Sequence, residues 1–94
     1  MSKLQVKVDH SLGAIEARKR IEKAAEDLRK ENASLVESLA WSASGAHVAG
    51  KGFEGDLTVG EREVVADIEL GFPASLMPMK ARREVESWLR GVLA

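Results

Sequence analysis

Residues 53–70, FEGDLTVGEREVVADIEL, form two runs of strand-like sequence joined by Gly60-Glu61. The second run, Arg62 to Leu70, alternates with a period of two, which is typical of a strand with one buried face. Gly60-Glu61 suits a tight hairpin between the two runs. The stretch therefore predicts an antiparallel pair with one face in water. In the second run the apolar face holds Val64, Ala66, Ile68 and Leu70, and the other face holds Glu63, Asp67 and Glu69, with Val65 as the one exception.

The residues before this hairpin predict two further strands. Glycine recurs at positions 45, 50, 52, 55 and 60, a spacing typical of antiparallel strands joined by short turns. One strand holds Leu39 and Trp41 and leads into a Ser44-Gly45 turn, and residues 46–49 form the returning strand. Gly55 lies inside a strand, which predicts a bulge or a close approach by a helix.

The amino-terminal residues predict a strand followed by a long helix. Residues 3–8 alternate strictly and place Leu4, Val6 and Val8 on one face. In the following Asp9-His10-Ser11, we expect Ser11 or Asp9 to satisfy free backbone N–H groups at the start of a helix. The helix is predicted from Leu12 to a stop near Asn32. Its narrow apolar stripe consists of Ala14, Ala17, Ile21, Ala24 or Ala25, and Leu28.

The carboxy-terminal residues predict a second helix. Gly71-Phe72-Pro73 ends the preceding strand, Ser75 or Met77 caps the helix, and Pro78 fits its first turn. The apolar stripe of this helix is Ala81, Val85, Trp88 or Leu89, and Val92. We therefore predict one α+β domain over residues 1–94 with the order β-α-β-β-β-β-α. It would be a two-layer sandwich, an antiparallel sheet with both helices on one face.

Composition excludes several classes of protein. The chain has 94 residues, a net charge of -1 and no cysteine, so it lacks disulfides, a thiolate zinc site and a cysteine nucleophile. A near-neutral charge disfavours nucleic acid as a partner. The segment from Met1 to His10 is neither a signal peptide nor a membrane span. We expect a cytoplasmic protein.

Few residues of the sequence suggest catalysis, metal binding or cofactor binding. Asp9-His10-Ser11 holds the residue types of a hydrolase triad, but consecutive residues point to alternate sides, so we interpret it as a strand end and helix cap. His47 is the only other histidine, too few ligands for a metal site. Residues 50–55 match G-x-G-x-x-G but lead into a strand rather than a helix, which argues against a dinucleotide site. We predict no catalytic residue, no metal and no cofactor.

The segment 70–79 has more apolar residues than a connection needs. We consider two alternatives for Phe72, Leu76, Met77 and Met79: they close one end of the core, or they form a partner-binding surface. Trp41 and Trp88 pose the same choice, and we expect both in the core with their N–H groups near its rim.

A series of residues along the chain has a familiar order: His10-Ser11-Leu12, Glu16-Ala17-Arg18, Ile21-Glu22, Ala25, Leu28, Gly55, Leu57, Val59, Val65, Leu70-Gly71-Phe72, Lys80, Val85-Glu86 and Leu89. Together they resemble a known family, the small polyhydroxyalkanoic acid system proteins, encoded beside polyhydroxyalkanoate genes. The resemblance spans nearly the whole chain, although many family members have proline where this chain has Gly13. It implies association with bacterial storage-polymer granules or their machinery in the cytoplasm, and it carries no catalytic residue.

Three hypotheses of function follow. The leading one is a non-enzymatic accessory protein that binds a polyhydroxyalkanoate granule surface or a granule-associated protein through residues 72–79. The second is a small apolar-ligand carrier or minimal enzyme with a cavity between sheet and helices. That hypothesis requires this space not to be filled by Leu39, Val64, Ile68, Val85 and Leu89. The third is a self-associating domain, a homodimer paired through an exposed strand edge.

Overall fold

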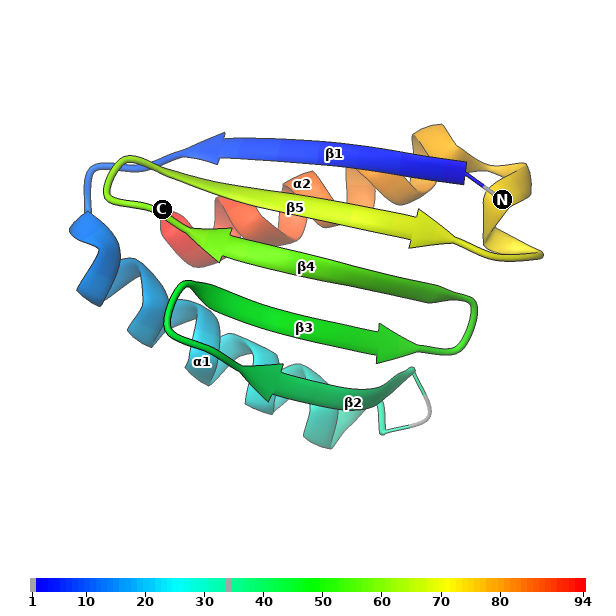
Figure 1. Cartoon of the computed structure of the whole chain (residues 1–94), viewed down its shortest axis with the longest axis horizontal. Helices are drawn as coiled ribbons and strands as arrows, with labels where there is room; N and C mark the ends of the chain where they lie inside the picture. The colour runs from blue at the N-terminus through cyan, green and yellow to red at the C-terminus, as the bar shows by residue number, and fades with distance from the viewer. Residues whose placement is uncertain (1, 34) are drawn as a thin grey trace.

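The computed structural model describes residues 2–33 and 35–94 and has the predicted order of elements (Figure 1). Two helices and five strands alternate as β-α-β-β-β-β-α, which confirms the α+β class. A short 3-10 helix, η1, precedes the second long helix. The elements are β1 Ser2–Asp9, α1 Gly13–Glu31, β2 Val36–Trp41, β3 Gly45–Gly50, β4 Phe53–Val59, β5 Glu63–Leu70, η1 Ala74–Leu76 and α2 Pro78–Leu93.

The five strands form one antiparallel sheet in the order β1-β5-β4-β3-β2. The predicted hairpin of residues 53–70 lies at its centre, with Phe53 opposite Leu70 and Val59 opposite Val64. The N–H of Gly60 donates to the Glu63 carbonyl at 2.8 Å and closes the turn. β1 pairs with the edge of β5 that is opposite β4, so the first and last strands in the sequence are neighbours in the sheet.

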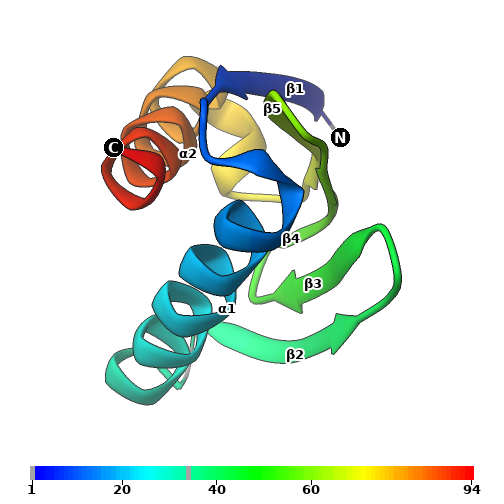
Figure 2. The same cartoon turned by 90° about the vertical axis from the view of Figure 1, so that its left-hand side faces the viewer.

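Alternation along the strands gives the sheet one apolar face and one polar face, as the sequence predicts. Both helices lie on one side of the sheet (Figure 2), and the side chains of that face form the core. β1 and β5 contribute Leu4, Val6, Val8, Val64, Ala66 and Leu70, and the helices contribute Ala17, Ile21, Leu89 and Leu93. Leu93 was not in the predicted stripe of the second helix.

The start of α1 differs from the sequence prediction. The helix begins at Gly13, and no side chain caps it at Leu12, so the prediction that Ser11 or Asp9 caps it is wrong. Instead, the Leu12 N–H donates to Nδ1 of His10 at 3.2 Å. His10 replaces the expected cap because its ring already lies at this corner, where Nε2 is 3.0 Å from the Gly60 carbonyl oxygen.

Glycine at position 13 has its own physical reason. Its φ of +80° lies in the left-handed region, which glycine adopts at little cost. Proline, with φ fixed near -65°, could not take this conformation. The first turn of α1 therefore departs from the proline-containing pattern of the resembling family at this residue.

The predicted end of the helix is confirmed, since the Asn32 N–H donates to the Leu28 carbonyl at 2.8 Å.

The predicted role of Gly55 needs a correction. Strand pairing is continuous through Gly55 on both sides, and the irregularity in the sheet lies between Val36 and Ser38 instead. A Cβ on Gly55 would come within 2.8 Å of the Asp67 carbonyl oxygen. The close approach is therefore made by the neighbouring strand β5, and neither a bulge nor a helix explains this glycine.

The second helix begins as predicted. Pro78 occupies its first turn and Met77 is the residue at the cap position, without a side-chain hydrogen bond. The Ala81 N–H donates to the Met77 carbonyl oxygen at 3.2 Å. Trp41 and Trp88 are half-buried and pack against the core, in agreement with the expectation for both.

Candidate functional site

The connection between β5 and α2, together with the first turn of α2, exposes four large apolar side chains, which we call the apolar end. Exposed fractions are 77% for Phe72, 69% for Leu76, 58% for Met77 and 63% for Met79. The alternative that these residues close the core is therefore wrong. Their place in the core is taken by Leu89 and Leu93 of α2 and, within η1, only Ala74 packs against the core.

Hydrogen bonds hold the backbone of the apolar end in one conformation. The Gly71 N–H donates to the Gly52 carbonyl oxygen at 2.9 Å, and the Ser75 N–H donates to the Gly71 carbonyl oxygen at 2.9 Å. The Leu76 N–H donates to Pro73 and the Met77 N–H to Ala74, each at 3.0 Å. The exposed side chains thus project from a hydrogen-bonded turn rather than from a free loop.

Two further exposed apolar side chains were missed by the sequence analysis. Ile15 is 81% exposed on the first turn of α1, and Leu35 is 45% exposed just before β2. The helical stripe could have flagged Ile15, because it falls outside the three- and four-residue steps that connect Ala14, Ala17 and Ile21. No comparable pattern marks Leu35.

An apolar cavity, which we call the hollow, lies between the sheet and the helices. Its volume is about 410 Å³. The sheet–helix space is therefore not filled, and four of the five residues that could have filled it, Leu39, Ile68, Val85 and Leu89, line it instead. Val64 is fully buried elsewhere in the core. The full lining is Ala25, Leu28, Leu35, Val36, Leu39, Val48, Lys51, Gly52, Phe53, Gly55, Asp56, Leu57, Ala66, Ile68, Leu70, Ala74, Ala81, Glu84, Val85, Trp88 and Leu89.

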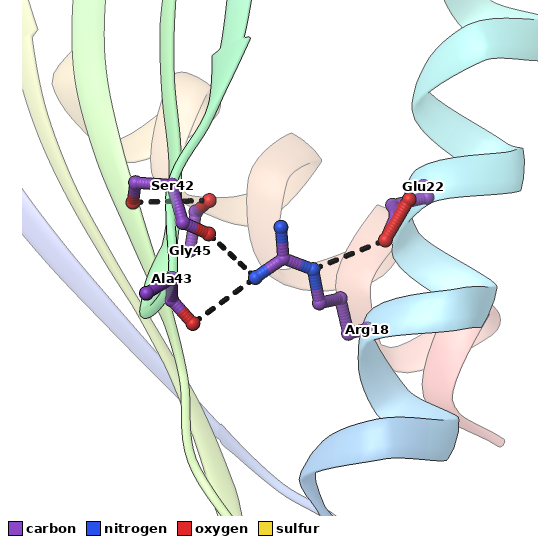
Figure 3. A network of polar contacts seen from close by, with 5 residues as sticks. All are labelled: Arg18, Glu22, Ser42, Ala43 and Gly45. Atoms are coloured by element: carbon purple, nitrogen blue, oxygen red, sulfur yellow. Dashed lines mark hydrogen bonds and ion pairs between the residues drawn. The ribbon is translucent and has the colours of Figure 1, made fainter.

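Arg18 ties α1 to the turn between β2 and β3 (Figure 3). Its Nη1 donates to the Ser42 carbonyl oxygen at 2.5 Å and to the Ala43 carbonyl oxygen at 3.1 Å. Nε pairs with Glu22 Oε1 at 3.1 Å, and the guanidinium lies 5.3 Å from the centre of the Trp41 ring. Arg18 sits two helical turns before Ala25, where α1 begins to line the hollow.

The polar face of the sheet carries an acidic cluster around His47. Nδ1 of His47 is 2.8 Å from Asp56 Oδ1, and Nε2 is 3.1 Å from Glu54 Oε2. Hydrogen bonds from Asp56 and then Glu54 raise the pKa of His47 above its usual range. In the neighbouring strand, Asp56 lies opposite Asp67 and Glu54 opposite Glu69, so a protonated His47 offsets repulsion between these like charges.

The other residues considered for chemistry, His10 and the glycines of residues 50–55, lie in separate parts of the fold. Within residues 2–33 and 35–94, no group of three or more acidic or histidine side chains is placed to hold a metal ion. His10 has both ring nitrogens engaged by backbone groups of Leu12 and Gly60. The glycines of residues 50–55 lie in the hairpin between β3 and β4.

Four of the residues behind the family resemblance, all between His10 and Ile21, have structural roles at the end of the sheet where α1 begins. His10 joins the β1–α1 corner to the β4–β5 turn. Ala17 and Ile21 are fully buried, and Arg18 reaches the β2–β3 turn. The corner thus fixes how α1 leaves the sheet, and with it one wall of the hollow.

Comparison with known proteins places the chain in a family. In the described part of the chain, no helix combines the length and the apolar character needed to cross a membrane. A comparison with curated proteins finds no match. The family model of the polyhydroxyalkanoic acid system proteins matches residues 4–93, nearly the whole chain, and this protein therefore belongs to that family.

Proposed function

We propose that this protein is a non-enzymatic accessory protein of the cytoplasmic polyhydroxyalkanoate system that binds the granule surface through its apolar end. The observation that carries the proposal is the exposure of Phe72, Leu76, Met77 and Met79 on the hydrogen-bonded connection between β5 and α2 and the first turn of α2. Family membership supplies the polymer context. Methionine side chains are flexible and adapt to irregular apolar partners such as a polymer surface.

The expected binding is reversible and insensitive to salt. Full burial of four large apolar side chains would contribute about 6–12 kcal/mol, against an association cost of about 4–15 kcal/mol. A single molecule therefore binds weakly to moderately. Since the chain has a net charge of -1, a general electrostatic attraction contributes little, and binding should persist at about 1 M salt, where charges are screened within about 3 Å.

A pelleting assay tests the proposal. The purified protein is mixed with native granules and, separately, with protein-free polymer particles, and the bound fraction is measured after centrifugation. The double substitution Met77→Asp and Met79→Asp should abolish pelleting with both. The matched control is Ile15→Asp, because Ile15 is equally apolar and exposed but lies on α1.

Each result has a definite meaning. Pelleting with both kinds of particle supports direct polymer binding, and pelleting with native granules alone identifies a granule-associated protein as the partner. Wild-type protein that stays in the supernatant of both contradicts the proposal. Equal loss of pelleting in the Ile15 and methionine variants would show that the apolar end is not the binding surface.

A further inference from the structure

The hollow is walled by apolar side chains that are only half covered by the rest of the molecule. Leu28 comes from α1, Leu39 and Val48 from the edge of the sheet, and Val85 and Trp88 from α2, and all five are half-buried. Behind them, β3 is paired on both sides and β2, the edge strand, on one side, and the side chains that line the hollow are mostly apolar. What the hollow offers a ligand is therefore apolar surface.

Size favours a small molecule over a protein segment. The volume of about 410 Å³ lies within the range of about 300–1,000 Å³ common for small-molecule sites. One turn of α-helix, about 10 Å wide and 5.4 Å long, would already occupy about 400 Å³. A water molecule takes about 30 Å³ in the liquid and a methylene group is of similar size, so about 410 Å³ accommodates a chain of about ten carbons.

Two exposed charged residues, Lys51 and Glu84, are among those that line this apolar space. Lys51 stands at the β3–β4 turn, and its backbone N–H donates to the Leu35 carbonyl at 3.3 Å. Within residues 2–33 and 35–94 it forms no ion pair. Glu84 lines the rim from α2. The third charged residue, Asp56, directs its carboxylate to His47 on the opposite face of the sheet.

We propose that the hollow binds the alkyl chain of a medium-chain aliphatic carboxylate, with the carboxylate beside Lys51 at the rim. Burial of the chain supplies most of the affinity, because the walls are apolar. Lys51 favours a carboxylate head group, and the opposing charge of Glu84 keeps that preference modest. This site goes beyond granule binding and does not depend on it.

Tryptophan fluorescence provides the readout. The chain has two tryptophans, and Trp88 lines the hollow, so the Trp41→Phe variant leaves Trp88 as the sole reporter. Decanoate, titrated below its micelle concentration, should change this fluorescence in a saturable way. Decanol, with the same chain length and a neutral head group, should also bind.

Matched substitutions locate the ligand. Ala25→Phe fills the hollow from α1 and should weaken decanoate binding at least about tenfold, whereas Ala24→Phe, half-buried on the same helix but outside the lining, should leave it unchanged. Val48→Phe fills the hollow from the sheet and gives a second test should Ala25→Phe fail to fold. Lys51→Gln should weaken decanoate binding about three- to tenfold and leave decanol binding unchanged.

Three results would overturn the proposal. One is the absence of a saturable fluorescence change with decanoate and with decanol. Another is that Ala24→Phe weakens decanoate binding as much as a folded variant that fills the hollow, Ala25→Phe or Val48→Phe. The third is that Lys51→Gln weakens decanoate and decanol binding equally, which would show that the ligand carboxylate does not lie beside Lys51. Isothermal calorimetry of the wild-type chain with decanoate gives an independent measure of the same affinity.

Discussion

The two halves of the apolar face have the same sequence pattern and very different burial. Over β1 and β5, Val6, Val8 and Val64 are almost completely buried. Over β2 and β3, Leu39 and Val48 are only half-buried and line the hollow. Alternation with a period of two therefore identifies which side chains face the helices, and it does not tell how closely a helix covers them.

The difference arises from the two helices. α2 packs along β1, whereas α1 makes its contacts chiefly with α2 and β4 and few with β2 or β3. Arg18 holds α1 to the β2–β3 turn at one end only. The half under α2 is a packed core, and the half under the carboxy-terminal part of α1 is open enough to accept a ligand.

The largest expected effect is a difference in stability between two variants, each of which truncates one leucine in one of the two halves. Leu4→Ala, at a buried position of β1 that does not line the hollow, should lower the free energy of unfolding by about 2–5 kcal/mol. Leu39→Ala should lower it by about 1 kcal/mol, because its side chain already borders empty space. Urea unfolding followed by circular dichroism measures both, and equal losses would mean that the two halves are equally well packed.

His10 should give the next largest effect. His10→Ala removes the hydrogen bonds to the Leu12 N–H and the Gly60 carbonyl oxygen and should cost about 1–2 kcal/mol of stability. Ser11→Ala is the matched control and should change stability by less than about 0.5 kcal/mol, because Ser11 does not cap α1. The same urea unfolding assay applies, and a larger loss for Ser11→Ala would restore serine as the cap.

Arg18 should affect the open half selectively. Arg18→Met removes the hydrogen bonds to Ser42 and Ala43 at a cost of about 1 kcal/mol. Hydrogen exchange should become faster in β2 and β3 and remain unchanged in β1 and β5. Lys23→Met, which removes an exposed ion pair with Asp27 on the same helix, should leave all four strands unchanged. Uniformly faster exchange in the Arg18 variant would contradict a local role.

The sequence predicted the order of elements and the faces of the strands because both depend on local periodicity. Residues 53–70 determine a hairpin, and Gly60-Glu61 determines where it turns. The exposure of Phe72 and Met79 could not be predicted, because it depends on whether α2 already fills the core with Leu89 and Leu93. The composition gives the number of apolar residues but does not show which of them are buried and which are exposed.

The hollow and the cap of α1 were out of reach for a related reason. Whether Leu39 and Val85 touch or border a cavity depends on the tilt of α1 over the sheet, which an amphipathic stripe leaves undetermined. His10 acts as the cap through a contact with Gly60, fifty residues away in the chain. Interactions of this kind follow from the assembled sheet and not from neighbouring sequence.

The smallest expected effect lies on the polar face of the sheet, away from both halves of the core. Asp56 and Glu54 raise the pKa of His47 above its ordinary value of about 6.5. A raised pKa in the folded state means that His47 stabilises the fold fully below a pH of about 6.5, and that this contribution disappears as the pH rises through the raised pKa. The effect is small because the side chains are exposed.

The substitution His47→Gln tests this sign directly. Compared with wild type, the variant should be slightly less stable at pH 5.5 and nearly equal in stability at pH 8.5, as measured by urea midpoints. Asp56→Asn should lower the pKa of His47 in an NMR titration, because it removes the hydrogen-bonding carboxylate with the largest influence. Glu54→Gln should lower it less. An unchanged pKa of His47 in both variants would mean that neither carboxylate raises this pKa in solution.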